Sequence, residues 1–355
     1  MNAAKKSWAR LAQDSVPPET LLAAASLADG PLAMIGKSMR LKLFSRLKTV
    51  EARVRSELAT VVGARGSLVT ARDWPLPPGW SEEELRGVWS SFSIDGSPPG
   101  MLDPYFTESY GRVLLTWELV RGRSGNALEL GSNPFFTTWM LQQFTDLTLS
   151  QANFFGQRGE ATQELAWTDR DGTLRRSPMS MQLFNMEEDT FPYADASFDI
   201  VACCEVIEHL LMDPLRSLRE IHRVLAPGGT LVLTTPNAGR LENVIALVQG
   251  RNIYDPYSGF GPYGRHNREF IPRELFRLLD FAGFSLQRIS TSDSHRWDRT
   301  PTAVVEASLA PMLAGRSPDL GQYIFCEAIA DHEPHAGWPD TFYRSRPAEE
   351  LVPWL

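Results

Sequence analysis

The sequence predicts an α/β fold with a doubly wound, mostly parallel sheet, preceded by an N-terminal helical extension. From about residue 101, short apolar runs typical of strands alternate with amphipathic runs typical of helices. One of these runs, 198–204, is apolar almost throughout, as expected for a parallel strand that is covered on both faces. Such alternation favours a sheet whose ligands bind at the carboxyl ends of its strands.

Length and charge limit the class of protein. The chain has 355 residues, a hydrophobic content of 43% and a net charge of -8. We expect a helical extension over 1–100, a candidate substrate lid or element of homo-oligomerisation, then a large domain over 101–330 and a C-terminal tail over 331–355. An acidic chain without a dominant basic block argues against a nucleic-acid partner. The absence of a signal peptide and of a long apolar run predicts a cytoplasmic protein without membrane contact.

The elements follow in order along the chain. An amphipathic helix is expected near 39–62, and within the large domain helices are expected near 137–144, after Asp213 and from Pro272 to about Gly283. Asp213 is a suitable N-cap, and the proline after it fits a first helical turn. Residues 291–320 would form an insertion. Seven strands are expected: 127–130, 147–151, 179–184, 198–204, 228–236, 284–290 and 322–330.

The stretch NALELGSNPFF, 126–136, predicts the first strand and a turn at its end. A dinucleotide site needs G-x-G-x-x-G, because a pyrophosphate contacts bare backbone at the helix start. Only Gly131 is present here. Pro134 has no N–H to offer and is expected in the first helical turn, capped by Ser132 or Asn133. The two phenylalanines that follow would crowd a diphosphate, which disfavours an NAD-dependent oxidoreductase.

The segment LELGSNPF resembles the first motif of the class I S-adenosylmethionine (SAM)-dependent methyltransferases. FNMEEDTFPYADASFD, EVIEH and VLAPGGTLVLTTPN resemble further motifs of that family, and the resemblance covers about residues 105–330. It implies a Rossmann-like seven-stranded sheet, a methyltransferase domain over 101–330, SAM as methyl donor and S-adenosyl-L-homocysteine (SAH) as product. The chain departs from the family pattern at Asn133 and Phe135, where glycines are usual, and at Asn153, where a carboxylate is usual.

The resemblance also implies a set of cofactor-binding residues. Glu129 would serve the ammonium group of SAM, and Asn153 would bind the ribose hydroxyls. Asn185 would face the adenine amino group, while Met186 would pack against the ring. The remaining candidates lie in the first turn, at the end of the fourth strand, or in a region that closes over the SAM tail in relatives: Gly131, Ser132, Asn133, Cys204, Tyr105 and Tyr110.

The catalytic candidates are His209, His266, Glu205 and Glu208. Methyl transfer to a hydroxyl needs a base near the sulfonium, and histidine is the natural choice at neutral pH. His209 ends EVIEH just beyond the fourth strand, and His266 lies on the loop before a later helix. E-x-x-E-H with a later histidine also resembles metal-dependent O-methyltransferases, which implies that the four residues are candidate ligands of a divalent metal. A metal-free site, whose floor EVIEH merely shapes, is the alternative.

These features predict SAM-dependent O-methylation of a small hydroxylated acceptor, a sugar or a natural product. The segment 250–266 is rich in Tyr, Phe and Gly and predicts an aromatic lid over the acceptor, with a packed surface loop as the alternative. N- or C-methylation on the same fold is a second function to be tested. A catalytically silent domain that binds SAM or a protein partner is a third.

Overall fold

A computed structural model of the chain describes residues 73–98, 100–295 and 300–353. Most of the predicted helical extension, including its amphipathic helix, therefore lies outside the described residues. The chain divides into two compact units, of which the larger comprises 68–244, 253–298 and 313–355. The smaller unit comprises 1–67, 245–252 and 299–312. Its described parts are residues 245–252, which include the end of α8 (Leu241–Val248), and residues 300–312, which include η4 (Thr300–Thr302) and most of α10 (Ala303–Leu313). None of the helices described is both long and apolar enough to cross a membrane.

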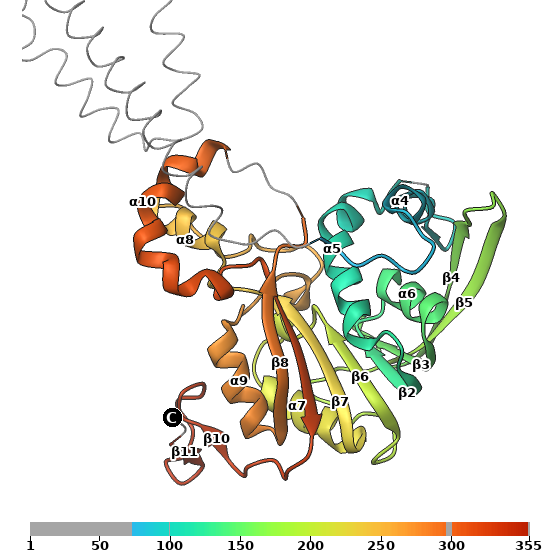
Figure 1. The fold of residues 1–355 in the computed structure, drawn as a ribbon. Coiled ribbons are helices and arrows are strands. Elements are labelled where there is room, and N and C mark those ends of the chain that lie inside the picture. The colour runs from blue at the N-terminus through green and yellow to red at the C-terminus, as the bar shows by residue number, and fades with distance from the viewer. Residues whose placement is uncertain (1–72, 99, 296–299, 354–355) are drawn as a thin grey trace, which may run out of the picture. The chain divides into compact units, whose positions relative to one another are not determined.

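A sheet of nine strands, in the order β1-β4-β5-β3-β2-β6-β7-β9-β8, forms the centre of the larger unit (Figure 1). From β5 to β7 all neighbours are parallel, and β9 then pairs antiparallel with both β7 and β8. Crossovers on both sides of β2 produce the doubly wound arrangement that was predicted. The strands are β1 (Ser93–Ile94), β2 (Ser124–Leu130), β3 (Asp146–Asn153), β4 (Gly159–Thr168), β5 (Leu174–Leu183), β6 (Phe198–Cys204), β7 (Leu225–Pro236), β8 (Phe284–Ser292) and β9 (Tyr323–Ala330).

The predicted number of strands was wrong, because β1 and β4 extend the sheet beyond the seven expected strands. β4 pairs antiparallel with β5 from Gly159 opposite Leu183 to Thr168 opposite Leu174. Its sequence, GEATQELAWT, is mostly polar and exposed over its first half, whereas Leu165, Ala166 and Trp167 near its end are buried. The segment between β3 and β5 is thus a hairpin arm, where an alternating α/β pattern would place a helix.

Helices cover both faces of the sheet (Figure 1). Leu128 and Leu130 of β2 pack in one core with α7 and α9, whereas Ala127 packs in another with α5 and α6. Because side chains alternate along a strand, Glu129 faces the α5 and α6 layer. The helices of this unit are α4 (Glu82–Ser90), α5 (Asp103–Val120), α6 (Phe136–Phe144), α7 (Pro214–Val224) and α9 (Pro272–Phe281), with short 3-10 turns η2 (Ile207–His209), η3 (Pro262–Gly264) and η5 (Ala314–Asp319).

The predicted start of α7 is confirmed. Asp213 is the N-cap, its side chain accepts a hydrogen bond from the Arg216 N–H, and a proline opens the helix. Leu215, Leu218 and Ile221 recur at helical spacing and form a buried apolar stripe on this helix. Capping and amphipathic spacing act within one helix, which is why the sequence alone sufficed here.

The helix α6 lies close to its predicted range, but its predicted cap and the predicted place of Pro134 in its first turn are wrong. Pro134 precedes the helix, and the N-cap is Phe135, in the left-handed region at φ 71°. Neither Ser132 nor Asn133 caps the helix with its side chain; instead the Ser132 carbonyl accepts the Phe135 N–H at 2.7 Å. Phe135 and Phe136 are buried in the aromatic core with α4 and α5. They therefore do not crowd the ligand side of the turn, contrary to expectation.

The C-terminal tail packs against the core on the α7 and α9 side. Trp338, Phe342, Tyr343 and Val352 all contact that core. A small parallel ladder joins β10 (Trp338–Pro339) to β11 (Leu351–Val352). The Tyr343 hydroxyl donates to the Asp213 carboxylate at 2.7 Å, so the tail is bonded to the cap of α7.

Candidate active site

A cavity of about 190 Å³ lies at the carboxyl ends of β2, β3 and β6. The strand order brings these ends to one edge of the sheet, where ligands of doubly wound folds bind. Predicted site residues from four separate segments therefore meet on its wall. The lining residues are Leu130, Gly131, Asn133, Ala152, Asn153, Phe154, Phe184, Asn185, Met186, Glu205, Val206, His209, Leu210 and Tyr263.

Gly131 is required by both its conformation and its surroundings. Its φ is +73°, and a Cβ built there would lie 2.6 Å from Cγ2 of Val206. The N–H groups of Gly131 and Ser132 both donate to the Ala152 carbonyl, at 2.9 and 3.3 Å. These N–H groups are therefore bonded to the end of β3, whereas a phosphate-binding turn would present them to the ligand.

Asn153 offers the cavity an unused donor. Its Oδ1 accepts the Phe154 N–H at 3.0 Å, while its buried Nδ2 has no hydrogen-bond partner among the described residues. A buried amide N–H is costly to leave unpaired, so a ligand acceptor would satisfy it. Asn133 differs, because its Nδ2 donates to Gln163 Oε1 of β4 at 2.9 Å.

Asn185 and Met186 line the same cavity, and Tyr263 joins them from the predicted lid. The Asn185 Nδ2 donates to the Tyr263 hydroxyl at 2.9 Å, and its Oδ1 accepts the Glu187 N–H at 2.9 Å. Tyr263 also packs its ring at 5.6 Å from that of Phe154. The segment 250–266 was expected to lie over the site, but Tyr263 was not predicted as a site residue.

Two predicted cofactor residues lie beside the cavity without lining it. Glu129 is buried, its Oε2 accepts the Thr138 hydroxyl at 2.6 Å, and burial raises its pKa to about 8. Cys204 is half-buried at the end of β6, and burial raises the pKa of its thiol to about 12. Both residues face the layer of α5 and α6.

Three further candidates also lie off the cavity wall. Ser132 is buried, and its hydroxyl has no partner within the described part of the chain. Tyr105 is 41% exposed and accepts a hydrogen bond from Arg112 at 3.1 Å. Tyr110 was wrongly expected near the SAM tail: it is fully buried against Trp89, because its position on α5 faces the aromatic core.

Arg112 is a buried cation that the sequence analysis missed. Its Nη2 donates to Ser109 Oγ at 2.8 Å, its Nη1 lies 3.7 Å from Glu205 Oε1, and its Nε has no partner among residues with described positions. Burial opposes the charge, but the Glu205 carboxylate and nearby tyrosines raise the pKa of Arg112. An arginine in the apolar run YGRVLLTW was the available signal, since arginine is seldom buried without a partner.

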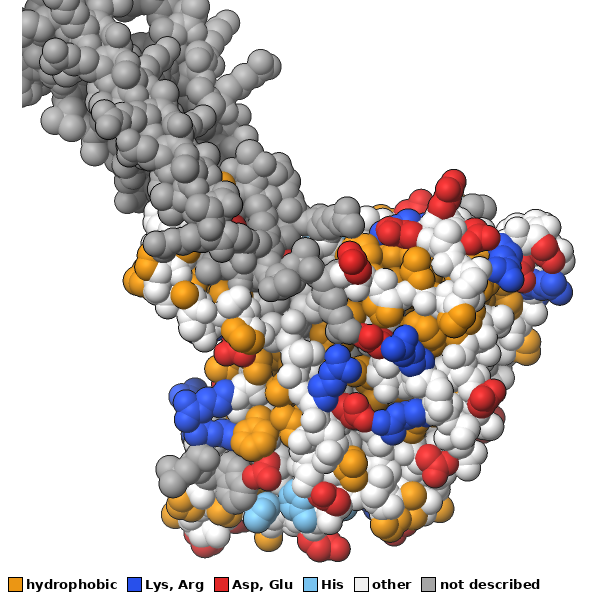
Figure 2. Space-filling view, in the orientation of Figure 1, with side chains coloured by type: hydrophobic (Ala, Val, Ile, Leu, Met, Phe, Trp, Pro, Cys, Tyr) orange, Lys and Arg blue, Asp and Glu red, His pale blue; other side chains and the backbone are white. Residues whose placement is uncertain are grey.

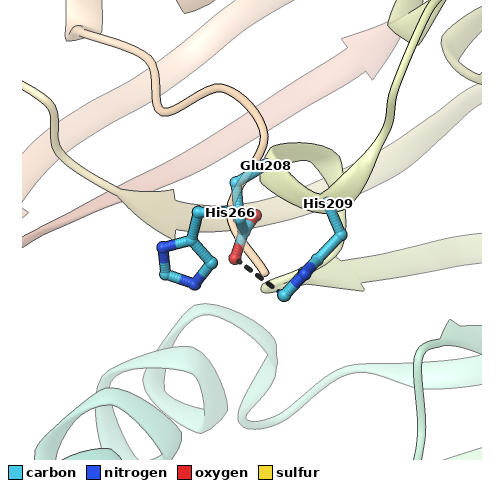
Figure 3. A group of neighbouring side chains, drawn as sticks. All are labelled: Glu208, His209 and His266. Carbon is cyan, nitrogen blue, oxygen red and sulfur yellow. Dashed lines mark ion pairs between the residues drawn. The ribbon is translucent and has the colours of Figure 1, made fainter. Parts of the chain in front are cut away.

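Glu208, His209 and His266 converge on one small space (Figure 3). Their potential ligand atoms all lie within 4.8 Å of one another. Glu208 is fully buried; its Oε2 accepts the Thr235 hydroxyl at 3.0 Å, and its Oε1 has no hydrogen bond within the described structure. Burial, with the charge of Glu205 second, raises the pKa of Glu208 to about 8.

Each histidine of this group uses Nδ1 for a hydrogen bond. His209 Nδ1 lies 3.0 Å from the Arg265 carbonyl, which can only accept, so Nδ1 carries hydrogen and Nε2 is left free. That Nε2 is 3.9 Å from Glu208 Oε1. Burial, with His266 nearby, lowers the pKa of His209. In His266 burial acts in the same direction, but a hydrogen bond to Glu269 and the surrounding carboxylates outweigh it and raise the pKa.

Glu205 belongs to a different set of contacts. It directly follows β6, with a φ of 57°. Its Oε1 accepts the Thr234 hydroxyl at 2.8 Å and lies 3.7 Å from Arg112 Nη1. The structure therefore brings together three of the four predicted metal-ligand candidates. One free carboxylate oxygen and two imidazoles, each anchored through Nδ1, fit a divalent cation of the first transition row.

Comparisons with known proteins agree with this geometry. Residues 158–233 match the family model described as "Methyltransferase domain". A probable S-adenosylmethionine-dependent methyltransferase of Mycolicibacterium smegmatis is 38% identical over 96 residues, 27% of this chain and 32% of that protein. A ubiquinone biosynthesis O-methyltransferase of Xanthomonas campestris is 37% identical over 105 residues, 29% of this chain and 42% of that protein.

Residues 158–233 thus resemble a methyltransferase domain. The alignments span less than half of either curated relative. Among solved structures, an S-adenosylmethionine-dependent methyltransferase of Mesorhizobium loti overlaps 62% of this chain and 97% of its own, with 14% identity and a TM-score of 0.36. The YcgJ protein of Bacillus subtilis overlaps 63% and 99%, with 15% identity and a TM-score of 0.37.

Proposed function

We propose that this methyltransferase domain binds SAM and transfers its methyl group to an oxygen of a small hydroxylated molecule, a sugar or a natural product. The observation that carries the proposal is the junction of two groups of residues at one strand edge. The cavity wall includes Gly131, Asn153 and Asn185, which resemble cofactor-binding positions, and also His209. His209 in turn lies beside Glu208 and His266. A methyl donor in the cavity would thus face the candidate base.

The proposed orientation of SAM follows from the polar atoms on and near the wall. The free Asn153 Nδ2 would donate to a ribose oxygen. Met186 and Phe184 offer apolar surface for the adenine ring. Beyond Glu205, Arg112 carries a buried charge with an unpartnered Nε, which suits the carboxylate of the methionine tail.

The chemistry needs one proton acceptor. As the acceptor oxygen forms its bond to the methyl carbon, the carbon–sulfur bond of SAM breaks and its electron pair stays on sulfur, leaving neutral SAH. The hydroxyl proton would pass to the free Nε2 of His266 or His209. In the alternative arrangement, Glu208, His209 and His266 would hold a divalent ion, which would polarise the acceptor oxygen; the hydroxyl proton would then pass to solvent, because both Nε2 lone pairs would be occupied.

Calorimetric titration of the full chain with SAH and with NADH tests the cofactor. We expect SAH to bind and NADH not to bind. Asn153→Ala should weaken SAH binding about 2- to 10-fold, the effect of one hydrogen bond. Asn126→Ala, an exposed position at the far end of β2, is the matched control and should leave the affinity unchanged. Binding of NADH but not SAH would overturn the proposal.

Transfer from isotopically labelled SAM to a panel of sugars and phenols tests the reaction. His266→Ala should lower O-methylation about 100-fold or more, because a general base contributes on that scale. Retained activity in this variant would favour N- or C-methylation. SAH binding without transfer to any acceptor class would favour a catalytically silent domain.

A further inference from the structure

We propose that Glu269 is a positioning residue that holds His266 with Nδ1 protonated and Nε2 free. The inference rests on the proposed function, because it assigns His266 the free nitrogen that proton transfer or metal binding would use. Glu269 Oε1 lies 3.0 Å from His266 Nδ1. An ionised carboxylate only accepts hydrogen bonds, so this contact requires hydrogen on Nδ1, and in the neutral ring the lone pair is then on Nε2.

Glu269 is itself held in place. Its other oxygen, Oε2, accepts a hydrogen bond from Arg240 Nη1. That same Arg240 nitrogen donates to the Asn237 carbonyl at 3.0 Å, directly after β7. The Glu269 side chain is only 12% exposed. Each oxygen of the carboxylate therefore has one strong partner, and the end of β7 fixes the position of the imidazole through Arg240.

The side chain of His266 is directed toward two other candidate ligands. His266 points into the space that it shares with Glu208 and His209 (Figure 3). His209 reaches the same tautomer through the Arg265 carbonyl. Two independent contacts thus leave an Nε2 lone pair on each of two neutral histidines, both of which neighbour Glu208. Removal of a residue that orients a metal-bound or catalytic histidine in this way typically lowers metal affinity or activity 10- to 100-fold.

Asp255 is the only other carboxylate that the described structure places within 4 Å of His266 Nδ1, and it serves as the matched control. Its Oδ2 lies 3.6 Å from Nδ1, beyond hydrogen-bonding distance, and accepts the His266 backbone N–H at 3.1 Å. We therefore expect Asp255 to anchor the loop without setting the tautomer.

Nitrogen-15 NMR of histidine-labelled full chain tests the inference, at a pH where His266 is neutral and with its signals assigned by their loss in His266→Gln. Wild type should show the Nδ1–H tautomer. Glu269→Ala should shift the population toward Nε2–H, whereas Glu269→Gln, whose amide oxygen still accepts, and Asp255→Asn should retain Nδ1–H. Glu269→Met preserves side-chain length without an acceptor and replaces the alanine variant if that variant does not fold.

An unchanged Nδ1–H tautomer in Glu269→Ala or Glu269→Met would overturn the inference, as would an equal shift in Asp255→Asn. With Mn²⁺ as the probe, Glu269→Ala should bind about 10- to 100-fold more weakly than wild type; equal affinity would also count against it. SAH titration of the same variants separates the two proposals. If wild type does not bind SAH, the proposed function is refuted but the inference about Glu269 is not, because the tautomer is measured without cofactor.

Discussion

At the scale of single residues, the site combines satisfied side chains with a few polar atoms left free. Asn153 Nδ2, Arg112 Nε and Glu208 Oε1 are buried without partners in the described structure, while the other polar atoms of these three side chains have contacts. Buried polar groups are usually paired, so free atoms grouped at one strand edge indicate places for ligand contacts.

Gly131→Ala should destabilise the domain and weaken SAH binding. The substitution forces a Cβ into the left-handed region and to within 2.6 Å of Val206 Cγ2. Gly172→Ala is the matched control, since its φ is +80° and nothing lies within 4 Å of its Cβ position. Urea unfolding should show a loss of about 1 kcal/mol for the control and a larger loss for Gly131→Ala. Equal losses of unfolding free energy in the two variants would mean that the Val206 side chain moves aside at little cost.

Glu129 should make stability depend on pH. Burial raises its pKa from 4.5 to about 8, so between these values the folded chain holds a proton that the unfolded chain releases. The free energy of unfolding should therefore fall as pH rises from about 5 to 8, by up to about 1.4 kcal/mol per pH unit from this group. In urea unfolding, the free energy of unfolding of Glu129→Gln should fall less steeply with rising pH than that of wild type. Glu160→Gln, an exposed position on β4, should follow wild type.

At the scale of elements, a side chain from the loop after β5 holds two other loops. Glu187, following β5, accepts the N–H groups of Leu211, Met212 and Asp213 at 2.8, 2.6 and 2.7 Å. The Tyr263 hydroxyl donates to the same carboxylate at 3.2 Å. One buried side chain thus links the loop after η2, the start of α7 and the predicted lid.

Glu187→Ala should cost about 2–4 kcal/mol of unfolding free energy, because it leaves several N–H groups without their charged acceptor. Hydrogen exchange should accelerate at residues 211–213. Glu188→Ala is the neighbouring control: its side chain is 56% exposed and pairs with Arg158, so a change within about 0.5 kcal/mol is expected. Similar losses in both variants would contradict this role of Glu187.

At the scale of the whole described molecule, the N- and C-terminal segments complete the domain. α4 and β1 add the aromatic core and the sheet edge next to β4, while the tail covers the α7 and α9 side. On the face drawn in Figure 2, acidic and basic side chains are interspersed. Among the described residues on this face, no continuous basic surface of the kind that favours nucleic-acid binding is seen.

Tyr343→Phe tests the contribution of the tail. The hydroxyl donates to Asp213 and accepts the Leu215 N–H at 3.1 Å, so its removal should lower the free energy of unfolding by about 1–2 kcal/mol. Tyr257→Phe provides the control, because Tyr257 is 92% exposed. Thermal and urea unfolding should show no loss for Tyr257→Phe. An unchanged Tyr343→Phe variant would mean that the tail does not stabilise the α7 cap.

Local patterns determined much of the fold. The seven core strands, the capped start of α7 and the single-glycine turn were readable because strand alternation, capping and turn preference act over a few residues. The same patterns brought Asn153, Asn185, His209 and their neighbours to one edge, since parallel strands end together. The strand β4 was not predicted, because a solvated hairpin of mixed composition resembles a loop.

Tertiary structure alone decided which side chains meet. Asn185 and Tyr263 are 78 residues apart, and Arg112 and Glu205 come from α5 and β6. Tyr110 and Tyr105 belong to one helix, yet the first is buried and the second is exposed. The physical reason is that contacts between distant segments depend on strand order and on which face each helix buries. No short stretch of sequence carries that information, whereas secondary structure is specified largely within one.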